Sequence, residues 1–317
     1  GAVIAGAYFG DKLSPLSDTT NLAAAVSGSN LFEHIKYMTI TTVPTIIITL
    51  IFFTFYNIFN LPNQTIENMQ YIESIKDYFY ISPILFIVPL IVILLIVKKI
   101  NPVISLFIGI MTAALLFLIF QNDLILSFSK ETGQNTYQIV INSIVSETNI
   151  KTETGFLNEL FYSGGMKGML NTIWLTISAM IFGGVMESIG ALKRISVYLL
   201  NKAKSTIGLF SSTIISCLTV NVSASDQYLA IVIPGKMFSQ AYKDRKLSSL
   251  NLSRTIEDSG TVTSVLIPWN TCGAYQAGVL NVSVLDYFIY AIFNWLSPIT
   301  TLIIASIGFK IKKLNEK

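Results

Sequence analysis

The sequence carries little charge. Asp, Glu, Lys and Arg make up 12% of its 317 residues, against about 25% in an average soluble domain. Apolar residues make up 52%, and the mean hydropathy is +0.62. The net charge of +3 comes from Lys and Arg residues spread over short segments, which excludes a basic patch for nucleic acid. Several apolar runs reach the roughly 20 residues that a helix needs to cross a bilayer. The composition therefore predicts an all-α polytopic membrane protein surrounded by lipid.

Cysteine and histidine are also scarce. The two cysteines, Cys217 and Cys272, fall within membrane segments, so we expect packing thiols and no disulfide framework. The single histidine, His34, is expected at the edge of a span. The sequence has no metal-ligand spacing, nucleophile elbow or phosphate loop. These absences argue against an intramembrane enzyme and against a bound cofactor.

Apolar segments mark the membrane spans. We predict full spans at Tyr37–Phe59, Phe79–Val97, Val103–Phe120, Leu170–Ser188 and Val284–Phe309. Pro44 and Pro298 are expected to kink the first and the last of them. Residues 193–204 mix basic and apolar side chains, which is typical of an amphipathic helix at the membrane surface. The segments Ile207–Val222 and Gln227–Phe238 are short and interrupted by polar residues, which favours a hairpin that returns to the side it left.

The basic and acidic loops alternate along the chain. The positive-inside rule places the basic segments in the cytoplasm: the turn at Lys98, residues 193–204, residues 243–254 and the tail Lys310–Lys313. The acidic loops at 60–78, with Glu67 and Glu73, and at 121–160, with Glu153, are then outside. We therefore predict a multi-pass protein of the cytoplasmic membrane. Whether it is a monomer or a homodimer stays open.

Two polar stretches interrupt this apolar chain, at Gly10–Ala23 and Glu257–Gly273. A shift of 253 positions brings Pro15 onto Pro268, Ala24 onto Ala277 and Glu33 onto Asp286. The predicted topology gives the broken segments 1–28 and 255–280 opposite orientations, as in the inverted repeats of many secondary transporters.

The repeat also predicts a division of the chain. Residues 1–120 would hold the remainder of the first repeat and the spans that follow, 121–160 an extracytoplasmic loop, and 161–317 the second repeat. The first repeat is then incomplete, because counterparts of about 157–253 would precede residue 1. We expect this chain to be part of a longer protein.

Acidic residues in or beside these membrane segments are the candidate ion and proton ligands. They are Asp11, Asp18, Asp226, Glu257 and Asp258. One isolated charge at the bilayer centre costs roughly 2.5–3.5 kcal/mol, so a group of them indicates a function. Hard cations take oxygen ligands, and the same stretches are rich in hydroxyls and amides. The candidates are Ser17, Thr19, Thr20, Asn21, Ser225, Ser259, Thr261, Asn270 and Thr271.

Structural roles are the alternative for each of these residues. Ser and Thr in membrane helices often bond to the preceding turn. Asp18 is a candidate helix N-cap, and Asp11 could pair with Lys12 at the membrane surface. A third polar break, Asn221–Gln227, lies at the tip of the predicted hairpin. The structural roles weaken the case for single residues, but they do not account for three polar breaks at membrane depth.

Four stretches resemble motifs of the NhaC family of Na⁺/H⁺ antiporters. They are the stretch 6–23 (GAYFGDKLSPLSDTTNLA), the stretch 224–235 (ASDQYLAIVIPG) and the stretches 252–264 (LSRTIEDSGTVTS) and 267–274 (IPWNTCGA). The resemblance implies a member of the wider ion transporter superfamily, with inverted repeats. It implies Na⁺ and H⁺ as the transported ions. The family also includes exchangers of malate for lactate, so the resemblance does not fix the substrate.

Two transport mechanisms follow from these observations. In the first, Na⁺ and H⁺ compete for Asp18, Asp226 and the pair Glu257 and Asp258 during alternating access, because desolvation favours the protonated acid and Na⁺ favours the carboxylate. In the second, a small organic anion moves with Na⁺ and pairs with Arg254, Lys236 or Lys12. Proton movement with Na⁺ as the only added solute would favour the first mechanism.

Overall fold

The computed structural model describes residues 1–15, 17–60, 75–98, 100–150, 152 and 155–314. Within these residues the chain is helical, and it has no strand, only isolated bridges between Thr148 and Ser163 and between Leu247 and Lys313. The chain forms two compact units: unit 1 comprises Gly1–Asn60 and Asn171–Lys317, and unit 2 comprises Leu61–Leu170. The predicted all-α fold class is confirmed.

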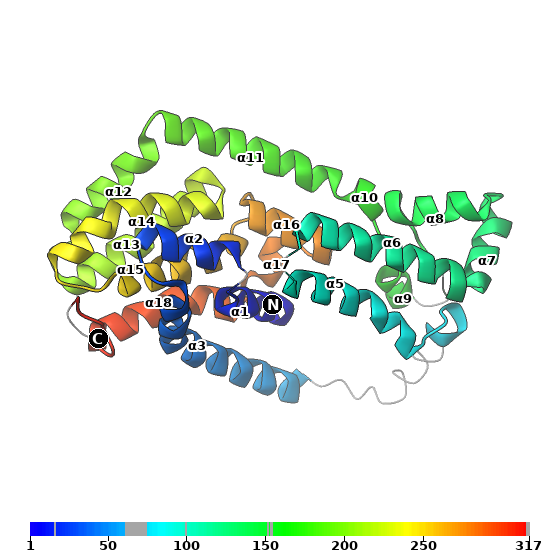
Figure 1. Ribbon diagram of the computed structural model, residues 1–317, viewed down its shortest axis with the longest axis horizontal. Helices are drawn as coiled ribbons and strands as arrows, with labels where there is room; N and C mark the ends of the chain where they lie inside the picture. Colours follow the sequence, from blue (N-terminus) through cyan, green and yellow to red (C-terminus); the bar gives the residue numbers. More distant parts are fainter. Residues whose placement is uncertain (16, 61–74, 99, 151, 153–154, 315–317) are drawn as a thin grey trace. The chain divides into compact units, whose positions relative to one another are not determined.

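Unit 1 joins the two ends of the chain. Its helices are α1 (Ala2–Leu13), α2 (Asp18–Ser27), α3 (Leu31–Asn60), α11 (Leu170–Ser188), α12 (Ala191–Lys202), α13 (Thr206–Ala224), α14 (Gln227–Asp244), α15 (Ser249–Ile256), α16 (Thr271–Leu280), α17 (Val284–Phe288) and α18 (Ile292–Ile307). Between α15 and α16 lie a π-helical turn, η2 (Glu257–Thr261), and a 3₁₀ turn, η3 (Ser264–Leu266). Blue helices from the start of the chain interleave with yellow and red ones from its end, with α2 against α14 and α15 and α3 against α18 (Figure 1).

Unit 2 contains the helices from the middle of the chain. They are η1 (Pro83–Phe86), α5 (Ile87–Val97), α6 (Pro102–Phe120), α7 (Asn122–Thr132), α8 (Thr136–Val145), α9 (Gly155–Leu160) and α10 (Gly165–Gly168). The segment 121–160, expected as a polar loop, is largely helical here, and a capping box of Asn135 and Gln138 begins α8. Glu67, Glu73 and Glu153 lie outside the described residues. The placement of this segment outside the membrane stays a prediction, as does the division of the chain at 120 and 160.

Helices of membrane-spanning length agree with much of the predicted topology. Among the described residues, four are long and apolar enough to cross a bilayer: Leu31–Asn60, Val103–Phe120, Gly165–Ser188 and Thr206–Ala224. The first begins six residues earlier than predicted, at Leu31, because the side chain of Asn30 accepts hydrogen bonds from the main-chain N–H groups of Phe32 and Glu33. The predicted hairpin is present as α13 and α14, although α14 extends to Asp244.

The last predicted span, Val284–Phe309, is wrong as one helix. It consists of α17 and α18, which are separate helices. The hydroxyl of Tyr287 donates a 2.7 Å hydrogen bond to the carbonyl of Val265 and holds α17 against η3. Because α18 packs instead on α3, the chain turns between the two helices.

Local structure repeats at the predicted shift of 253 positions. The shift carries α2 onto α16, both ten residues long, and carries the N-cap Ser17 onto the N-cap Asn270. It also carries the C-cap Gly28 (φ +73°) onto the C-cap Asn281 (φ +50°), both in the left-handed conformation. The next helices, α3 and α17, begin at matching residues. This repeat supports an internal duplication, and its inverted orientation remains a prediction.

Candidate functional site

The acidic pair Glu257 and Asp258 begins the π-helical turn η2. Both side chains are fully buried. A π-helical turn closes i to i+5 hydrogen bonds, as from the N–H of Val262 to the carbonyl of Glu257, and such turns are frequent at functional sites. The turn packs against α2, α13, α14, α15 and α18. Two adjacent acids are therefore held in the interior of unit 1, away from its surface.

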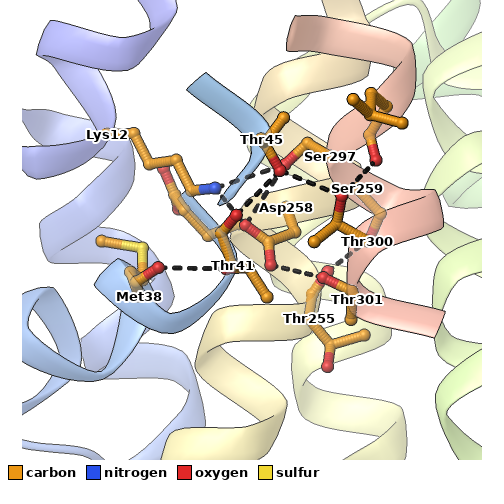
Figure 2. A network of polar contacts seen from close by, with 12 residues as sticks. Lys12, Met38, Thr41, Thr45, Thr255, Asp258, Ser259, Ser297, Thr300 and Thr301 are labelled. Carbon is orange, nitrogen blue, oxygen red and sulfur yellow. Dashed lines mark hydrogen bonds and ion pairs between the residues drawn. The ribbon is translucent and has the colours of Figure 1, made fainter. Parts of the chain in front are cut away.

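Asp258 forms an ion pair with Lys12 of α1, and both side chains are fully buried. Ser297 lies between them, 3.2 Å from Lys12 Nζ and 3.4 Å from Asp258 Oδ1. The hydroxyl of Thr301 donates a 2.5 Å hydrogen bond to Asp258 Oδ2. Figure 2 shows these side chains meeting Asp258 from α1 and α18. A buried carboxylate needs such a partner, because removing one member of a buried pair leaves an uncompensated charge.

A row of buried hydroxyls lies along α3, and two of its members, Thr41 and Thr45, lie close to Asp258 in Figure 2. Thr41, Thr45 and Thr49 are buried at four-residue intervals on α3. The hydroxyls of all three threonines donate to carbonyls of their own helix, and Thr45 Oγ1 lies 3.0 Å from Thr300 Oγ1 of α18. The sequence-based site did not include this row, nor Lys12 as the partner of Asp258. The four-residue spacing of polar residues in an apolar span was the signal that could have identified it.

Glu257 and Asp11 share the hydroxyl of Thr19. Thr19 Oγ1 lies 3.2 Å from Asp11 Oδ2 and 3.4 Å from Glu257 Oε1. One hydroxyl hydrogen serves only one carboxylate at a time. Glu257 Oε2 is buried and has no hydrogen-bond partner among the described residues. A proton or a cation at this position would satisfy an acceptor that is costly to leave unpaired.

Asp18 and Asp226 stand at the starts of helices. Asp18 Oδ2 accepts a 2.5 Å hydrogen bond from the hydroxyl of Tyr228, and the N-cap of α2 is the neighbouring Ser17. Asp226 is itself the N-cap of α14 and accepts from the N–H of Leu229 at 2.9 Å. Asp226 thus has a structural role that is compatible with an ion role, because capping uses one of its oxygens.

The hairpin tip contacts both the π-helical turn and the second helix break. Asn221 donates to the carbonyl of Gly260 at 2.7 Å, and Asn270 donates to Asn221 at 3.2 Å. The N–H of Thr271 bonds to the carbonyl of Ser225 at 2.9 Å. The third polar break therefore lies beside the second.

Other candidate ligands bond chiefly to nearby main chain. Thr20 lies within 3.4 Å of the carbonyls of Asp11 and Lys12, Asn21 donates to the carbonyl of Ser17, and Ser259 donates to that of Thr255. Thr261 Oγ1 is buried without a hydrogen-bond partner among the described residues. In the same part of the chain, no group of three His, Cys, Asp or Glu side chains is placed to hold a metal ion. A cation here would take oxygens from carboxylates and hydroxyls together.

Discontinuous helices whose ends surround the ion site are a feature of many secondary transporters. The sequence matches the Na⁺/H⁺ antiporter family over residues 6–309. The chain therefore belongs to the Na⁺/H⁺ antiporter family, and the resemblance inferred from the four sequence stretches is confirmed.

Individual relatives agree with the family. The chain is 34% identical over 313 residues to the Na⁺/H⁺ antiporter NhaC of Alkalihalophilus pseudofirmus, an alignment that covers 99% of the chain and 65% of that protein. It is 33% identical to NhaC of Bacillus subtilis, covering 96% of the chain and 65% of that protein. It is also 33% identical to the malate-2H⁺/Na⁺-lactate antiporter of Bacillus subtilis, covering 94% of the chain and 61% of that protein. The chain spans 65% of the length of the two NhaC proteins, and no solved structure matches it.

Proposed function

We propose that the protein containing this chain exchanges Na⁺ for H⁺ across the cytoplasmic membrane by alternating access. The observation that carries the proposal is the buried carboxylate group at Glu257 and Asp258, with one unsatisfied oxygen and one ammonium partner. The two NhaC relatives are named for the same exchange.

The exchange would arise from competition at these carboxylates. Desolvation favours a protonated acid, whereas Na⁺ favours the ionised form and takes oxygen ligands. A proton on Glu257 or Asp11 would satisfy the acceptor that the single Thr19 hydroxyl leaves unpaired. Binding of Na⁺ would release that proton, so each carboxylate holds one cation or the other and the two fluxes are coupled.

The Lys12 ammonium would hold Asp258 while the site is free of Na⁺. A sodium ion at Asp258 would take over the neutralising role of Lys12, with Ser297 and Thr301 supplying hydroxyl oxygens. Because Lys12 belongs to α1 and Asp258 to η2, the change of partner would alter how the two broken segments are held together. That coupling is what alternating access requires.

Replacing the carboxylates in the full-length protein tests this proposal. We expect Asp258→Asn, Glu257→Gln and Asp226→Asn to reduce Na⁺-dependent proton movement in everted vesicles to the level of vesicles without the protein. Asparagine at position 226 can still cap α14. Loss of exchange in Asp226→Asn would therefore be due to the missing carboxylate charge and not to a lost helix cap. Asp244 is exposed at the end of α14, and Asp244→Asn is the matched control, which should exchange normally. Full exchange by both Asp258→Asn and Glu257→Gln would overturn the proposal.

A Na⁺-coupled carrier of small organic acids is the second candidate. Arg254 favours it: the side chain is fully buried, its guanidinium stacks 4.5 Å from the ring of Tyr37, and its nitrogens have no hydrogen-bond partner among the described residues. Lys236 is exposed and Lys12 is paired, which leaves Arg254 as the cation for a carboxylate. Proteoliposomes with Na⁺ as the only added solute separate the candidates, because exchange without an organic acid favours Na⁺/H⁺ antiport.

A further inference from the structure

Three basic segments meet at one end of unit 1. They are the end of α12 with the turn after it (201–205), the connection from α14 to α15 (243–248) and the C-terminal segment 310–314. The guanidinium of Arg245 donates a hydrogen bond to the carbonyl of Ala203, which joins the first two segments. The N–H of Leu314 donates to the carbonyl of Lys246 at 2.9 Å, which joins the second and the third. Parts of the chain that are far apart in sequence therefore form one surface, which we call the basic surface.

The basic surface has a large excess of positive charge. Its basic residues are Lys202, Lys204, Lys243, Arg245, Lys246, Lys310, Lys312 and Lys313. The three segments contain one acidic residue, Asp244, which accepts a 2.7 Å hydrogen bond from Gln240. All of the lysines except Lys312 are exposed. A cluster of one sign attracts a partner of the opposite charge.

Contacts with the core of unit 1 fix the C-terminal segment. The hydroxyl of Tyr37 donates a 2.6 Å hydrogen bond to the carbonyl of Lys310, and the N–H of Lys312 lies 3.2 Å from the same hydroxyl. Ile311 packs against a cluster of buried apolar side chains. The backbone that carries these lysines is thus already ordered, which lowers the entropy cost of binding a partner.

Aromatic rings beside the basic surface indicate that it lies at the level of lipid headgroups. Lys202 Nζ lies 4.7 Å from the ring centre of Tyr198, and Lys310 Nζ lies 5.3 Å from that of Phe309. Both rings are more than half exposed. Amphipathic aromatic and lysine side chains are typical of the membrane–water interface. The candidate span α13 also begins at Thr206, directly after the first basic segment.

We propose that the basic surface binds the headgroups of anionic phospholipids. A phospholipid satisfies both features of the surface, because its phosphate pairs with the lysines and its acyl chains contact the exposed rings of Tyr198 and Phe309. A soluble acidic partner would pair with the lysines but leave these rings in water. The lipid partner is separate from ion exchange, because the basic surface is exposed whereas Glu257 and Asp258 are buried.

A fluorophore at position 201 measures the lipid contact. Asn201 is exposed on α12, and Asn201→Cys is labelled with bimane in full-length protein whose native cysteines are replaced by serine. The protein is reconstituted in phosphatidylcholine vesicles in potassium buffer, with a small fraction of phosphatidylglycerol or phosphatidylcholine that is spin-labelled near the headgroup. We expect the phosphatidylglycerol to quench at least threefold more strongly, because each basic residue near an anionic bilayer strengthens binding about fivefold. Raising KCl to about 0.5 M should remove most of the difference.

A second label position and two charge variants locate the binding. Ile181→Cys is the matched label position, because Ile181 is exposed in the middle of α11, and both lipids should quench it equally. The combined variant Lys202→Gln, Lys204→Gln, Lys243→Gln should lose the preference at position 201. Its control removes the same charge from exposed positions of unit 2 and should keep the preference: Lys76→Gln, Lys130→Gln, Lys167→Gln.

Four outcomes would overturn the proposal. Equal quenching by both lipids at position 201 would show no selectivity for anionic headgroups. Absence of quenching by either lipid would place the surface in water, within reach of soluble acidic partners only. The same preference at position 181, or an equal loss in both charge variants, would show attraction to the charge of the whole protein. Because no transport is measured, these outcomes are independent of Na⁺/H⁺ exchange.

Discussion

Lys12 and Asp258 connect parts of the chain that are far apart in sequence. Lys12 follows Asp11 in the first polar stretch, and Asp258 follows Glu257 in the second. Neighbouring residues of each stretch have different partners. Asp11 and Glu257 both contact the hydroxyl of Thr19, whereas Lys12 and Asp258 form an ion pair with each other. The result is one pair of opposite charges beside one pair of like charges. Such an arrangement suits a site that exchanges one cation for another.

The energetics of the Lys12 and Asp258 pair give a prediction at this scale. We expect Lys12→Met to lower the free energy of unfolding by about 3–5 kcal/mol, because Asp258 is left buried and unpaired. The double variant Lys12→Met, Asp258→Asn should recover most of that loss, because it carries neither charge. Thermal unfolding of the purified full-length protein provides the double-mutant cycle.

The control for this cycle is Lys36→Met. Lys36 is exposed on α3, so its replacement should change stability by no more than about 0.5 kcal/mol. If the losses of Lys12→Met and Asp258→Asn simply add in the double variant, the two residues do not act as a buried pair.

At the scale of elements, the helix break before α16 depends on close backbone approach. Gly273 lies in the first turn of α16, and a Cβ atom there would collide with the carbonyl oxygen of Ile267. Glycine therefore lets α16 begin directly against the chain that precedes it. The equivalent start of α2 depends on Ser17 and Thr20. Residues close to each break thus determine where the following helix begins: a glycine for α16 and a side-chain cap for α2.

Substituting glycines in two helices tests this dependence. We expect Gly273→Ala to destabilise the protein by about 1–3 kcal/mol, because the added methyl overpacks the break. Gly6→Ala in α1 is the matched change: nothing lies within 4 Å of its Cβ position, so the higher helix propensity of alanine should stabilise by up to about 1 kcal/mol. Melting temperatures measure both effects. Stabilisation by Gly273→Ala would show that the break tolerates a side chain.

Local signals in the sequence determine much of this architecture. Pro15 and Pro268, each among Ser, Thr and Asn residues, predict helix breaks because proline and capping residues act within a few positions. The turn between α17 and α18 was not predictable, since it depends on the distant contact of Tyr287 with Val265. Nor was the burial of His34, which is fully buried in α3 although its position indicated a membrane edge. Tertiary packing decides both.

The candidate site shows the same limit. The acidic residues could be named from the sequence because charge is rare in it, but their pairing could not. Asp11 and Lys12 are adjacent and suggested a local pair, whereas Lys12 bonds across the fold to Asp258. The threonine row on α3 was hidden by the high hydropathy of its span. Sequence spacing identifies which residues are unusual, and packing decides which of them meet.

At the scale of the whole molecule, the repeat and the predicted topology both concern the orientation of the two broken segments in the membrane. The shift of 253 positions matches α2 with α16 in length and in both caps. If the match reflects an inverted repeat, the two broken segments cross the membrane in opposite directions. That requires the segment around Lys130 and the loop around Lys243 to face opposite sides, and the hairpin of α13 and α14 to return to the side it left.

Three exposed lysines give the test of this orientation. Lys130→Cys, Lys204→Cys and Lys243→Cys are each introduced into full-length protein whose native cysteines are replaced by serine. We expect a membrane-impermeant maleimide to label Lys130→Cys only in right-side-out vesicles, and the other two only in everted vesicles, because basic segments face the cytoplasm. Labelling of Lys204→Cys and Lys243→Cys from opposite sides would exclude the hairpin. Labelling of all three from one side would show that the chain does not cross the membrane between Lys130 and Lys204, and the inverted orientation depends on that crossing.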